Sequence, residues 1–403
     1  MKRTLYIAFT IFICCTVLTG CWGQRELNEL SIAFALGIDF VDGEYVVTTQ
    51  IINPSELSPA RQEGGGDQAP VATYVAKGQT LFEAFRRLTK VAPRKVYFSY
   101  VRIVVLGETL ARRGILDSLD FLLRKNEFRT DFYLLVARGT RAEETLRVLT
   151  NFNPIPAEKV FSAIEKSESF WAATGKVTID ELITDVIQEG REPVLTGLRI
   201  ESDQGNQGAQ ESVQTIEQQA SLTLADMGAF RGNKFIGWLS ETESKGFNYT
   251  QNNVFDTITT VPCPDKGKLA VKIRRSEATL RTKVTNGLPR GSISIQLEGN
   301  IGDVACDVDL SQEKTILALK RQTENKIRDV ISESVHKAQK ELHSDIFGFG
   351  EQLSRSDPHA WATLKNNWGD IFADMPIEIA VNVDIRASGS MTKSLEEIMR
   401  ERR

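Results

Sequence analysis

Histidine and cysteine supply most of the acid–base, nucleophilic and metal-binding side chains of proteins. This chain of 403 residues has three histidines, His336, His343 and His359, and five cysteines. His336 and His343 are seven residues apart, so both can lie on one side of a helix, where we interpret them as solvated side chains. The sequence contains no His-x-x-x-His pair and no Cys-x-x-Cys pair for zinc.

The sequence also lacks the common catalytic motifs. It has no Gly-x-Ser-x-Gly nucleophile elbow and no Gly-x-x-x-x-Gly-Lys-Ser/Thr phosphate-binding loop. Aspartate and glutamate are plentiful, but a sequence alone does not pair carboxylates across a fold. We therefore expect no catalytic residue, no cofactor site and no metal site, and we interpret the chain as a protein that is not an enzyme.

One cysteine near the N-terminus is placed for covalent modification. Two basic residues precede an apolar run over 5–18, and Leu18-Thr19-Gly20-Cys21 closes that run. A cationic start, an apolar segment and small residues before the cut are the parts of a secretory signal. The last four residues also resemble the bacterial lipobox, whose cysteine thiol receives a diacylglyceryl group. We predict a lipoprotein signal peptide over 1–20 and a lipid on Cys21.

The apolar run is too short to be a membrane span. As a helix, residues 5–18 would reach only about 21 Å at about 1.5 Å per residue, against a hydrocarbon core of about 30 Å. Two acyl chains hold a protein stably at a membrane, whereas one chain holds it marginally. Acylated Cys21 is therefore expected to bind membrane lipid and to keep the rest of the chain outside the cytoplasm.

Composition excludes some partners. The chain has 49 basic and 53 acidic residues, well mixed, and no basic stripe of the kind that binds nucleic acid. An apolar content of 41% is ordinary for a globular protein, and the length indicates two or three domains.

Two cysteines remain for the folded part of the chain. Cys14 and Cys15 leave with the signal peptide, and Cys21 is lipidated. Outside the cytoplasm Cys263 and Cys306 can form one disulfide. The alternative is two buried thiols, and the sequence does not decide between them.

The first part of the chain alternates strands and helices, which predicts an α/β domain over 21–195. A strand pair over 32–52 turns at Asp42-Gly43. The other expected strands are 72–76, 96–106, 132–137 and 194–200, and the expected helices are 81–88, 110–123, 142–149, 155–170 and 179–187.

A small β-rich middle domain is expected over 196–262, with a hairpin around Arg231-Gly232-Asn233. The Gln-rich stretch 201–219 is either a boundary or a long loop inside this domain.

The C-terminal domain, 263–403, is expected to be an antiparallel sheet with one long helix over 312–342, whose apolar residues recur on one stripe. Its expected strands are 269–273, 277–283, 292–301 and 377–385, with a short helix over 359–368. The predicted fold class is thus α+β, a mixture of α and β in three domains, with helices packed on sheets.

Two aromatic stretches each have two interpretations. Phe347-Gly348-Phe349-Gly350 follows the long helix, and we favour a helix stop with aromatic packing over a ligand loop. Arg94–Tyr100 mixes cations with aromatic residues, and is either a surface for a partner or an ordinary amphipathic strand.

Several short motifs follow one another along the chain. They are Leu18-Thr19-Gly20-Cys21-Trp22, Arg25-Glu26-Leu27, Ala35-Leu36-Gly37-Ile38-Asp39, Val104-Val105-Leu106-Gly107-Glu108, Ala111-Arg112-Arg113-Gly114-Ile115, and Asp345-Ile346-Phe347-Gly348-Phe349-Gly350 with Trp361 and Trp368. In order, spacing and length this set resembles the C-subunit lipoproteins of bacterial spore germinant receptors, the Ger(x)C family. The glycines at 64–66 and the Gln-rich stretch match no motif of that family.

The resemblance implies a three-domain α/β lipoprotein on the outer face of the inner spore membrane. There it would assemble with multi-spanning A and B subunits into a receptor that senses small nutrients and starts germination. The resemblance implies one defined site in this chain, the lipidated cysteine Cys21. A different class, a free lipid-anchored solute-binding protein, predicts two similar lobes around a cleft, and the sequence shows no such duplication. An extracytoplasmic enzyme acting on envelope polymers is the third alternative.

Overall fold

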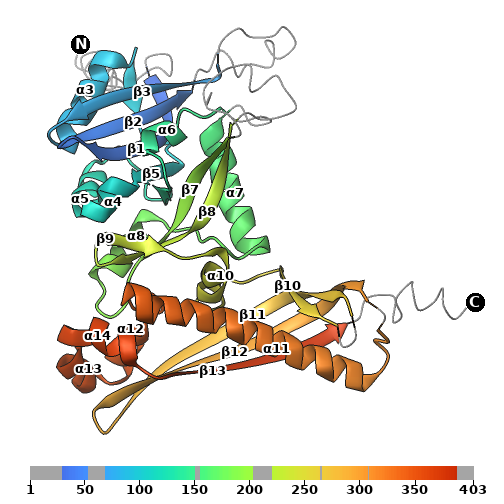
Figure 1. The fold of residues 1–403 in the computed structure, drawn as a ribbon. Helices are drawn as coiled ribbons and strands as arrows, with labels where there is room; N and C mark the ends of the chain where they lie inside the picture. The colour runs from blue at the N-terminus through green and yellow to red at the C-terminus, as the bar shows by residue number, and fades with distance from the viewer. Residues whose placement is uncertain are drawn as a thin grey trace, which may run out of the picture.

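The structure is a computed structural model, and it describes residues 30–52, 69–149, 155–202, 220–263, 266–306 and 308–387. Cys21, the expected signal peptide and residues 203–219 of the Gln-rich stretch lie outside these residues. Figure 1 shows the described chain as an elongated molecule, with the first strands and helices at one end and a long hairpin with its crossing helix at the other.

Nine strands form the first sheet, in the order β3-β2-β1-β5-β6-β7-β8-β9, with β4 beside the start of β1. Strands β1, β5, β6 and β7 run parallel to one another, and the pairs outside them are antiparallel. The bounds are β1 Leu30–Val41, β2 Glu44–Ile52, β3 Val71–Gly78, β4 Lys95–Tyr97, β5 Ile103–Gly107, β6 Tyr133–Ala137, β7 Val194–Ser202, β8 Ala220–Arg231 and β9 Lys234–Trp238.

The central strands of this sheet are apolar on both faces. Every residue of β5 and β6 is buried, as expected for parallel strands that helices cover from both sides. Val104 and Leu106 pack with α3, α4 and α5, whereas Ile103 and Val105 pack with α6 and α7. The helices of this part are α3 Leu81–Val91, α4 Glu108–Arg113, α5 Leu116–Arg124, α6 Ala142–Thr145, α7 Pro156–Phe170, α8 Ile179–Ile187 and α10 Glu241–Thr250.

Two predicted elements of this part are interrupted. The expected helix 110–123 is two helices, because Gly114 has a φ of 132° that ends α4. The expected strand 96–106 is also two strands, because β4 pairs with the start of β1 and β5 pairs further along the same strand. The turn between them lets Phe98 enter the core.

The second sheet has four strands in the order β10-β11-β12-β13, with bounds Thr257–Pro262, Lys268–Thr285, Leu288–Ala305 and Ile377–Ala387. Helix α11, Glu313–His336, lies across one face (Figure 1), and the six residues Lys337–Leu342 extend it as a π-helix. Leu319 and Ile327 of this helix belong to the same core as Ile295 of β12. Burial alternates along β12, so its other face is open to solvent.

One prediction for this sheet is wrong. Strand β13 runs parallel to β12, with Ile293 opposite Ile379, so the sheet is mixed rather than antiparallel. The chain leaves β12, passes along α11 and returns through α12 Phe349–Ser356, α13 Pro358–Leu364 and α14 Trp368–Asp374. A helical crossover of this kind carries the chain back to the end of the sheet where β12 begins, so β13 starts there and runs in the same direction as β12.

Other elements differ in extent. The expected strands 269–273 and 277–283 are one strand, β11, with an irregular register between Ile273 and Arg275. Helices α10 and α12 and strand β10 were not expected. For α10 the signal is in the sequence, because Ser240 and Glu243 form a capping box at its start.

The expected middle domain, 196–262, contributes to both sheets. Its strands β7, β8 and β9 continue the first sheet, with Leu135 of β6 opposite Thr196, and β10 is the edge strand of the second sheet. The division into three domains stays a prediction. In the described part of the chain, no helix is both long and apolar enough to cross a membrane.

Candidate functional site

The three histidines lie at the surface. His336 ends α11, His343 follows the π-helix in a left-handed conformation, and His359 is in α13; all three side chains are exposed. Our interpretation of His336 and His343 as solvated residues is confirmed, although His343 lies just past the helix rather than in it. Within the described ranges, no cluster of three or more His, Cys, Asp or Glu side chains is placed to hold a metal ion.

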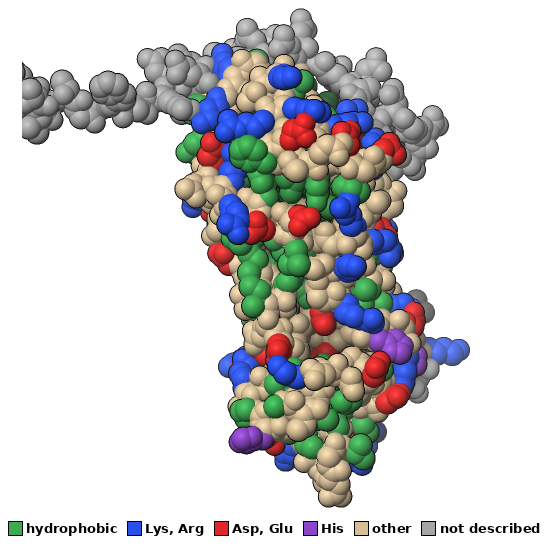
Figure 2. Space-filling model, turned by 90° about the vertical axis from the view of Figure 1, so that its left-hand side faces the viewer, with side chains coloured by type: hydrophobic (Ala, Val, Ile, Leu, Met, Phe, Trp, Pro, Cys, Tyr) green, Lys and Arg blue, Asp and Glu red, His purple; other side chains and the backbone are tan. Residues whose placement is uncertain are grey.

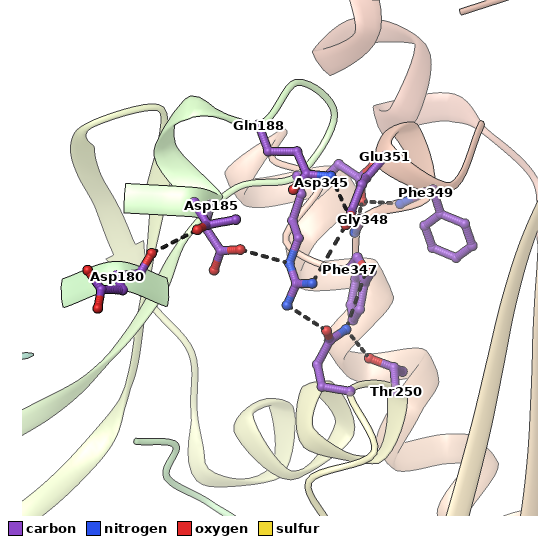
Figure 3. A network of polar contacts seen from close by, with 12 residues as sticks. Asp180, Asp185, Gln188, Thr250, Asp345, Phe347, Gly348, Phe349 and Glu351 are labelled. Atoms are coloured by element: carbon purple, nitrogen blue, oxygen red, sulfur yellow. Dashed lines mark hydrogen bonds and ion pairs between the residues drawn. The ribbon is translucent and has the colours of Figure 1, made fainter. Parts of the chain in front are cut away.

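A network of polar contacts, drawn in Figure 3, joins the parts of the chain that carry the two sheets. Its contacts meet at Arg191. The guanidinium of Arg191 lies 3.4 Å from Asp185 and 3.6 Å from Glu351, and it donates a 2.9 Å hydrogen bond to Gln251 Oε1. Gln188 donates to the same Glu351 carboxylate at 2.7 Å. These side chains come from α8 and its following loop, from the end of α10, and from α12. The network therefore connects segments up to 163 residues apart in the sequence.

Main-chain contacts reinforce this junction. Glu351 N donates to Gly190 O at 2.8 Å, and Glu192 N donates to Asp345 O at 3.0 Å. Gly190 has a φ of 86°, and a Cβ there would lie 2.4 Å from the carbonyl carbon of Gly350. The two backbones touch because both positions are glycine.

Asp345 organises the start of α12. Its carboxylate accepts hydrogen bonds from the backbone N–H groups of Gly348, Phe349 and Gly350, at 2.8–3.2 Å, and from Trp368 Nε1 at 2.8 Å. Burial raises the pKa of Asp345 to about 6, against the opposing effect of these hydrogen bonds. The carboxylate is thus used to position main chain around Phe347-Gly348-Phe349-Gly350.

That aromatic stretch packs as we favoured. Phe347 and Phe349 are buried, and their ring centroids lie 6.5 Å and 6.2 Å from that of Phe372. Gly348 has a φ of 88° and precedes α12, so the stretch opens a new helix. The expected helix stop lies earlier in the chain, because the long helix ends at Leu342, where His343 is left-handed.

Asp39 plays a similar part in the first sheet. Its buried carboxylate accepts hydrogen bonds from Ala142 N and Glu143 N, both at 2.9 Å, and so caps α6. Burial raises the pKa of Asp39 as well. A Cβ at Gly107 would lie 2.1 Å from Asp39 Oδ1, so the Asp39 side chain has room in this position only because residue 107 is glycine.

Two polar cavities flank the Arg191 network. One of about 490 Å³ lies between α8 and α10, with Asp180, Asp185 and Glu192 in its wall. The other, of about 300 Å³, is lined by Asp345, Trp361 and Trp368 among others. Burial raises the pKa of Asp185 and of Glu192, so these acids lie in a poorly solvated site.

A groove of about 680 Å³ opens between α3 and α5. Its floor is aromatic, with the ring of Phe85 4.7 Å from Phe121 and 5.1 Å from Phe98. Its rim carries cations and fewer carboxylates: Arg86, Lys95, Arg124 and Lys125, with Asp120 and Glu127. We call this feature the α3–α5 groove.

The stretch Arg94–Tyr100 borders this groove. Lys95 is exposed and Val96 is buried, the alternation of an amphipathic strand, and Phe98 reaches the groove floor. A role of this stretch in binding a partner stays a prediction.

Cys263 and Cys306 form a disulfide in the structure, which joins the end of β10 to the end of β12. The sulfur atoms are 2.01 Å apart and the residues are 43 positions apart in the sequence. The disulfide stays a prediction for the purified protein. Cys21 lies outside the described residues, so its lipidation also stays a prediction.

Sequence reasoning missed the buried acids and Arg191. Asp39 and Asp345 lie inside motifs that we noted for their resemblance, but we assigned them no role. A short acidic residue in an apolar run, close to glycines, is a signal for such a capping position. Arg191 and Glu351 carry no comparable signal, because their contact depends on the packing of the two sheets.

Comparisons with known proteins agree with this architecture. Residues 23–200 match a family described as "Spore germination protein N-terminal domain", and residues 225–389 match one described as "Spore germination B3/GerAC like, C-terminal". Spore germination protein KC of Bacillus subtilis is 30% identical over 96% of this chain and 97% of that protein. Spore germination protein B3 of the same organism is 25% identical over 95% of this chain and 98% of that protein.

The fold itself resembles a solved structure. The crystal structure of the GerBC protein matches with a TM-score of 0.51 and 18% sequence identity, covering 87% of this chain and 96% of that one. The α+β fold class is thereby confirmed. Two family matches in the expected order, and 30% identity along nearly the whole length, show that the chain belongs to the Ger(x)C family of spore germination proteins.

Proposed function

We propose that this chain is the membrane-anchored lipoprotein subunit of a nutrient germinant receptor and is needed for nutrient-triggered spore germination. The observation that carries the proposal is the similarity to spore germination proteins KC and B3 over 95% or more of this chain. Similarity of this extent covers both sheets and the junction between them, rather than one module alone.

The anchor in this proposal is a diacylglyceryl group on Cys21. It places the protein on the outer face of the inner spore membrane, beside the multi-spanning A and B subunits. Tethering confines all three proteins to two dimensions, which raises their effective concentration without requiring a large interface.

The subunit acts without catalysis in this proposal. Among the acids that the structure describes, Asp39 and Asp345 are the most deeply buried, and both accept hydrogen bonds from helix N-termini. Both side chains therefore serve the architecture, and their raised pKa values follow from burial rather than from a reacting group.

Affinity purification of the tagged full-length chain from detergent-solubilised spore membranes tests the proposal. We expect two multi-spanning proteins in comparable amounts, and a diacylglyceryl mass on the peptide that begins at Cys21. The matched control is Cys21→Ala, which should lose the membrane fraction and both partners. Recovery of the lipidated chain alone would sink the subunit assignment.

The α3–α5 groove favours one second candidate, the free lipid-anchored solute-binding protein. Its volume of about 680 Å³ lies within the range of small-molecule sites, about 300–1,000 Å³. Titration of the purified chain with amino acids and sugars in a calorimeter distinguishes the two. Saturable heat that disappears in Phe121→Ala would favour solute binding by this subunit.

A further inference from the structure

Positive charge is concentrated on α3 and the segment that leads into β4. Residues 82–95 contain five cations, Arg86, Arg87, Lys90, Arg94 and Lys95, against a single carboxylate, Glu83. The whole chain has more acidic than basic residues, 53 against 49, so this excess is local. Figure 2 shows Lys and Arg side chains gathered at the upper end of the molecule, where α3 lies in Figure 1.

Several of these cations are uncompensated. Arg87 pairs with Glu83, and Lys95 lies 3.4 Å from Glu127. Arg86, Lys90 and Arg94 are exposed and have no carboxylate partner among the described residues. Their charge is therefore available to an external anion.

An exposed aromatic ring accompanies the free cations. Phe82, Arg86 and Lys90 are four residues apart along α3 and lie on one stripe of the helix. The side chain of Phe82 is 60% exposed, and the guanidinium of Arg86 lies 5.1 Å from its ring centroid. We call these three residues the α3 stripe.

The α3 stripe forms one wall of the α3–α5 groove, because Phe82 and Arg86 line both. On the opposite wall Asp120 and Glu127 are engaged by Arg124 at 2.7 Å and by Lys125 at 3.0 Å. The groove thus offers an apolar aromatic floor under a rim whose net charge is positive. This combination suits an amphiphile with a negative head group.

The start of β1 lies at this same surface. Leu30 is opposite Lys95 in the β1–β4 pair, so their backbones are neighbouring strands about 4.8 Å apart. Cys21 is nine residues before Leu30, a stretch that spans at most about 32 Å when fully extended. A lipid on Cys21 would therefore hold this surface, rather than the far end of the molecule, near the membrane.

We propose that the α3 stripe, the neighbouring Arg94 and the cationic rim of the α3–α5 groove are a membrane-contact surface that binds anionic phospholipid head groups. The cations Arg86, Lys90 and Arg94 attract anionic head groups, and Phe82 enters the interface between head groups and acyl chains. This inference takes one point from the proposed function, namely the membrane at which the protein lies. It orients the protein with α3 toward the bilayer and the second sheet away from it.

Vesicle sedimentation of a chain that lacks residues 1–21 tests this surface without the anchor. That chain retains every residue that the structure describes. The vesicles are phosphatidylcholine alone, or phosphatidylcholine with phosphatidylglycerol. The test variant combines Arg86→Glu, Lys90→Glu and Arg94→Glu. The matched control combines Lys314→Glu, Arg321→Glu and Lys326→Glu, three exposed cations of α11 with no ion pair among the described residues.

We expect the unmodified chain to bind only the vesicles that contain phosphatidylglycerol, and to be released by salt. Each cation near an anionic surface contributes about fivefold to partitioning, so the triple reversal should lower it at least about 100-fold. The α11 control should change it less than about fivefold. Phe82→Ser should weaken binding about tenfold without changing its salt dependence. Circular dichroism confirms that each variant is folded.

Equal binding of the unmodified chain and the α3 variant would overturn the proposal, as would equal binding to both kinds of vesicle. Loss of the multi-spanning proteins from the full-length α3 variant, with vesicle binding intact, would make the surface a protein interface and would also overturn it. The diacylglyceryl mass on Cys21 is measured separately. Failure of this proposal is therefore distinguishable from failure of the receptor-subunit assignment.

Discussion

The two sheets of this protein bury their residues in different ways. The central strands of the first sheet are covered by helices on both faces, so Val104 and its neighbour Val105 are both fully buried. The second sheet has α11 on one face only, so Ile295 is buried and Ser294 is exposed. In each half of the molecule a buried carboxylate caps a helix, Asp39 at the start of α6 and Asp345 at the start of α12. A polar residue at the centre of a sheet covered on both sides needs hydrogen-bond partners inside the protein, as Asp39 has, whereas a half-covered sheet exposes every second position to water.

The sharpest test of this difference places a charge on each face. Val104→Asp and Val105→Asp should each cost about 5 kcal/mol or more, comparable to the whole stability of a domain, because either leaves an unpaired buried charge. Ser294→Asp should change the unfolding free energy by no more than about 0.5 kcal/mol. Thermal unfolding followed by circular dichroism measures all three. A folded Val105→Asp variant would show that the α6–α7 face is less closely packed than described.

Reduction of the disulfide should destabilise only the second sheet. Closing a loop of 43 residues between Cys263 and Cys306 lowers the conformational entropy of the unfolded chain. In the chain-entropy model this raises the free energy of unfolding by about 4 kcal/mol. Peptide mapping without reductant should show the linked pair, and Cys263→Ser should reproduce the effect of reductant on the melting temperature. Two free thiols in the untreated protein would contradict the pairing.

The two carboxylates should differ in cost when each becomes an amide. In Asp345→Asn, either orientation of the amide leaves two of the four donors without an acceptor, which predicts a loss of about 3 kcal/mol at neutral pH. In Asp39→Asn only one of the two donors is left without an acceptor, so we expect about half as large a loss of unfolding free energy. Denaturant unfolding of both variants measures the two losses of unfolding free energy. Equal losses would show that the number of donors left without an acceptor does not control the cost.

The pH dependence of stability should report Asp345. Burial raises its pKa from an ordinary value of 3.8 to about 6, so the folded chain holds this proton more tightly than the unfolded chain does. The resulting stabilisation is fully present below about pH 4 and is lost as the pH rises through about 6. Between about pH 4 and a pH well above 6, the unfolding free energy of the unmodified chain should fall by about 2–3 kcal/mol relative to that of Asp345→Asn. Unfolding curves that stay parallel with pH would exclude this contribution.

Much of the fold could be predicted from local patterns. The turn at Asp42-Gly43, the apolar stripe of α11 and the buried strand β6 each carry a signal within a short window. The direction of β13 carries none, because it depends on how the chain returns past α11 to the far edge of the sheet. Gly114 could have predicted the break between α4 and α5, but the apolar periodicity on both sides of it indicated one helix.

The candidate sites were less predictable, for two physical reasons. The Arg191 network depends on side chains that come together only when both sheets are packed, such as Gln188 and Glu351. The charge on α3 was present in the sequence, but the near balance of the whole chain concealed it. Local charge, read with the exposed face of the helix, would have found Arg86 and Lys90 before the structure did.

The glycine contact between Gly190 and Gly350 has a mechanical consequence. Main-chain hydrogen bonds at 2.8 Å and 3.0 Å bind the two halves backbone to backbone, with little side-chain freedom between them. A joint of this kind resists bending, so we expect the two sheets to move as one body. Each strand of the β11–β12 hairpin has 18 residues, about 60 Å of ribbon, and the hairpin runs across the end of the molecule rather than along its length (Figure 1). The glycine contact therefore fixes the direction in which the hairpin turn at Asn286-Gly287 is presented relative to the first sheet.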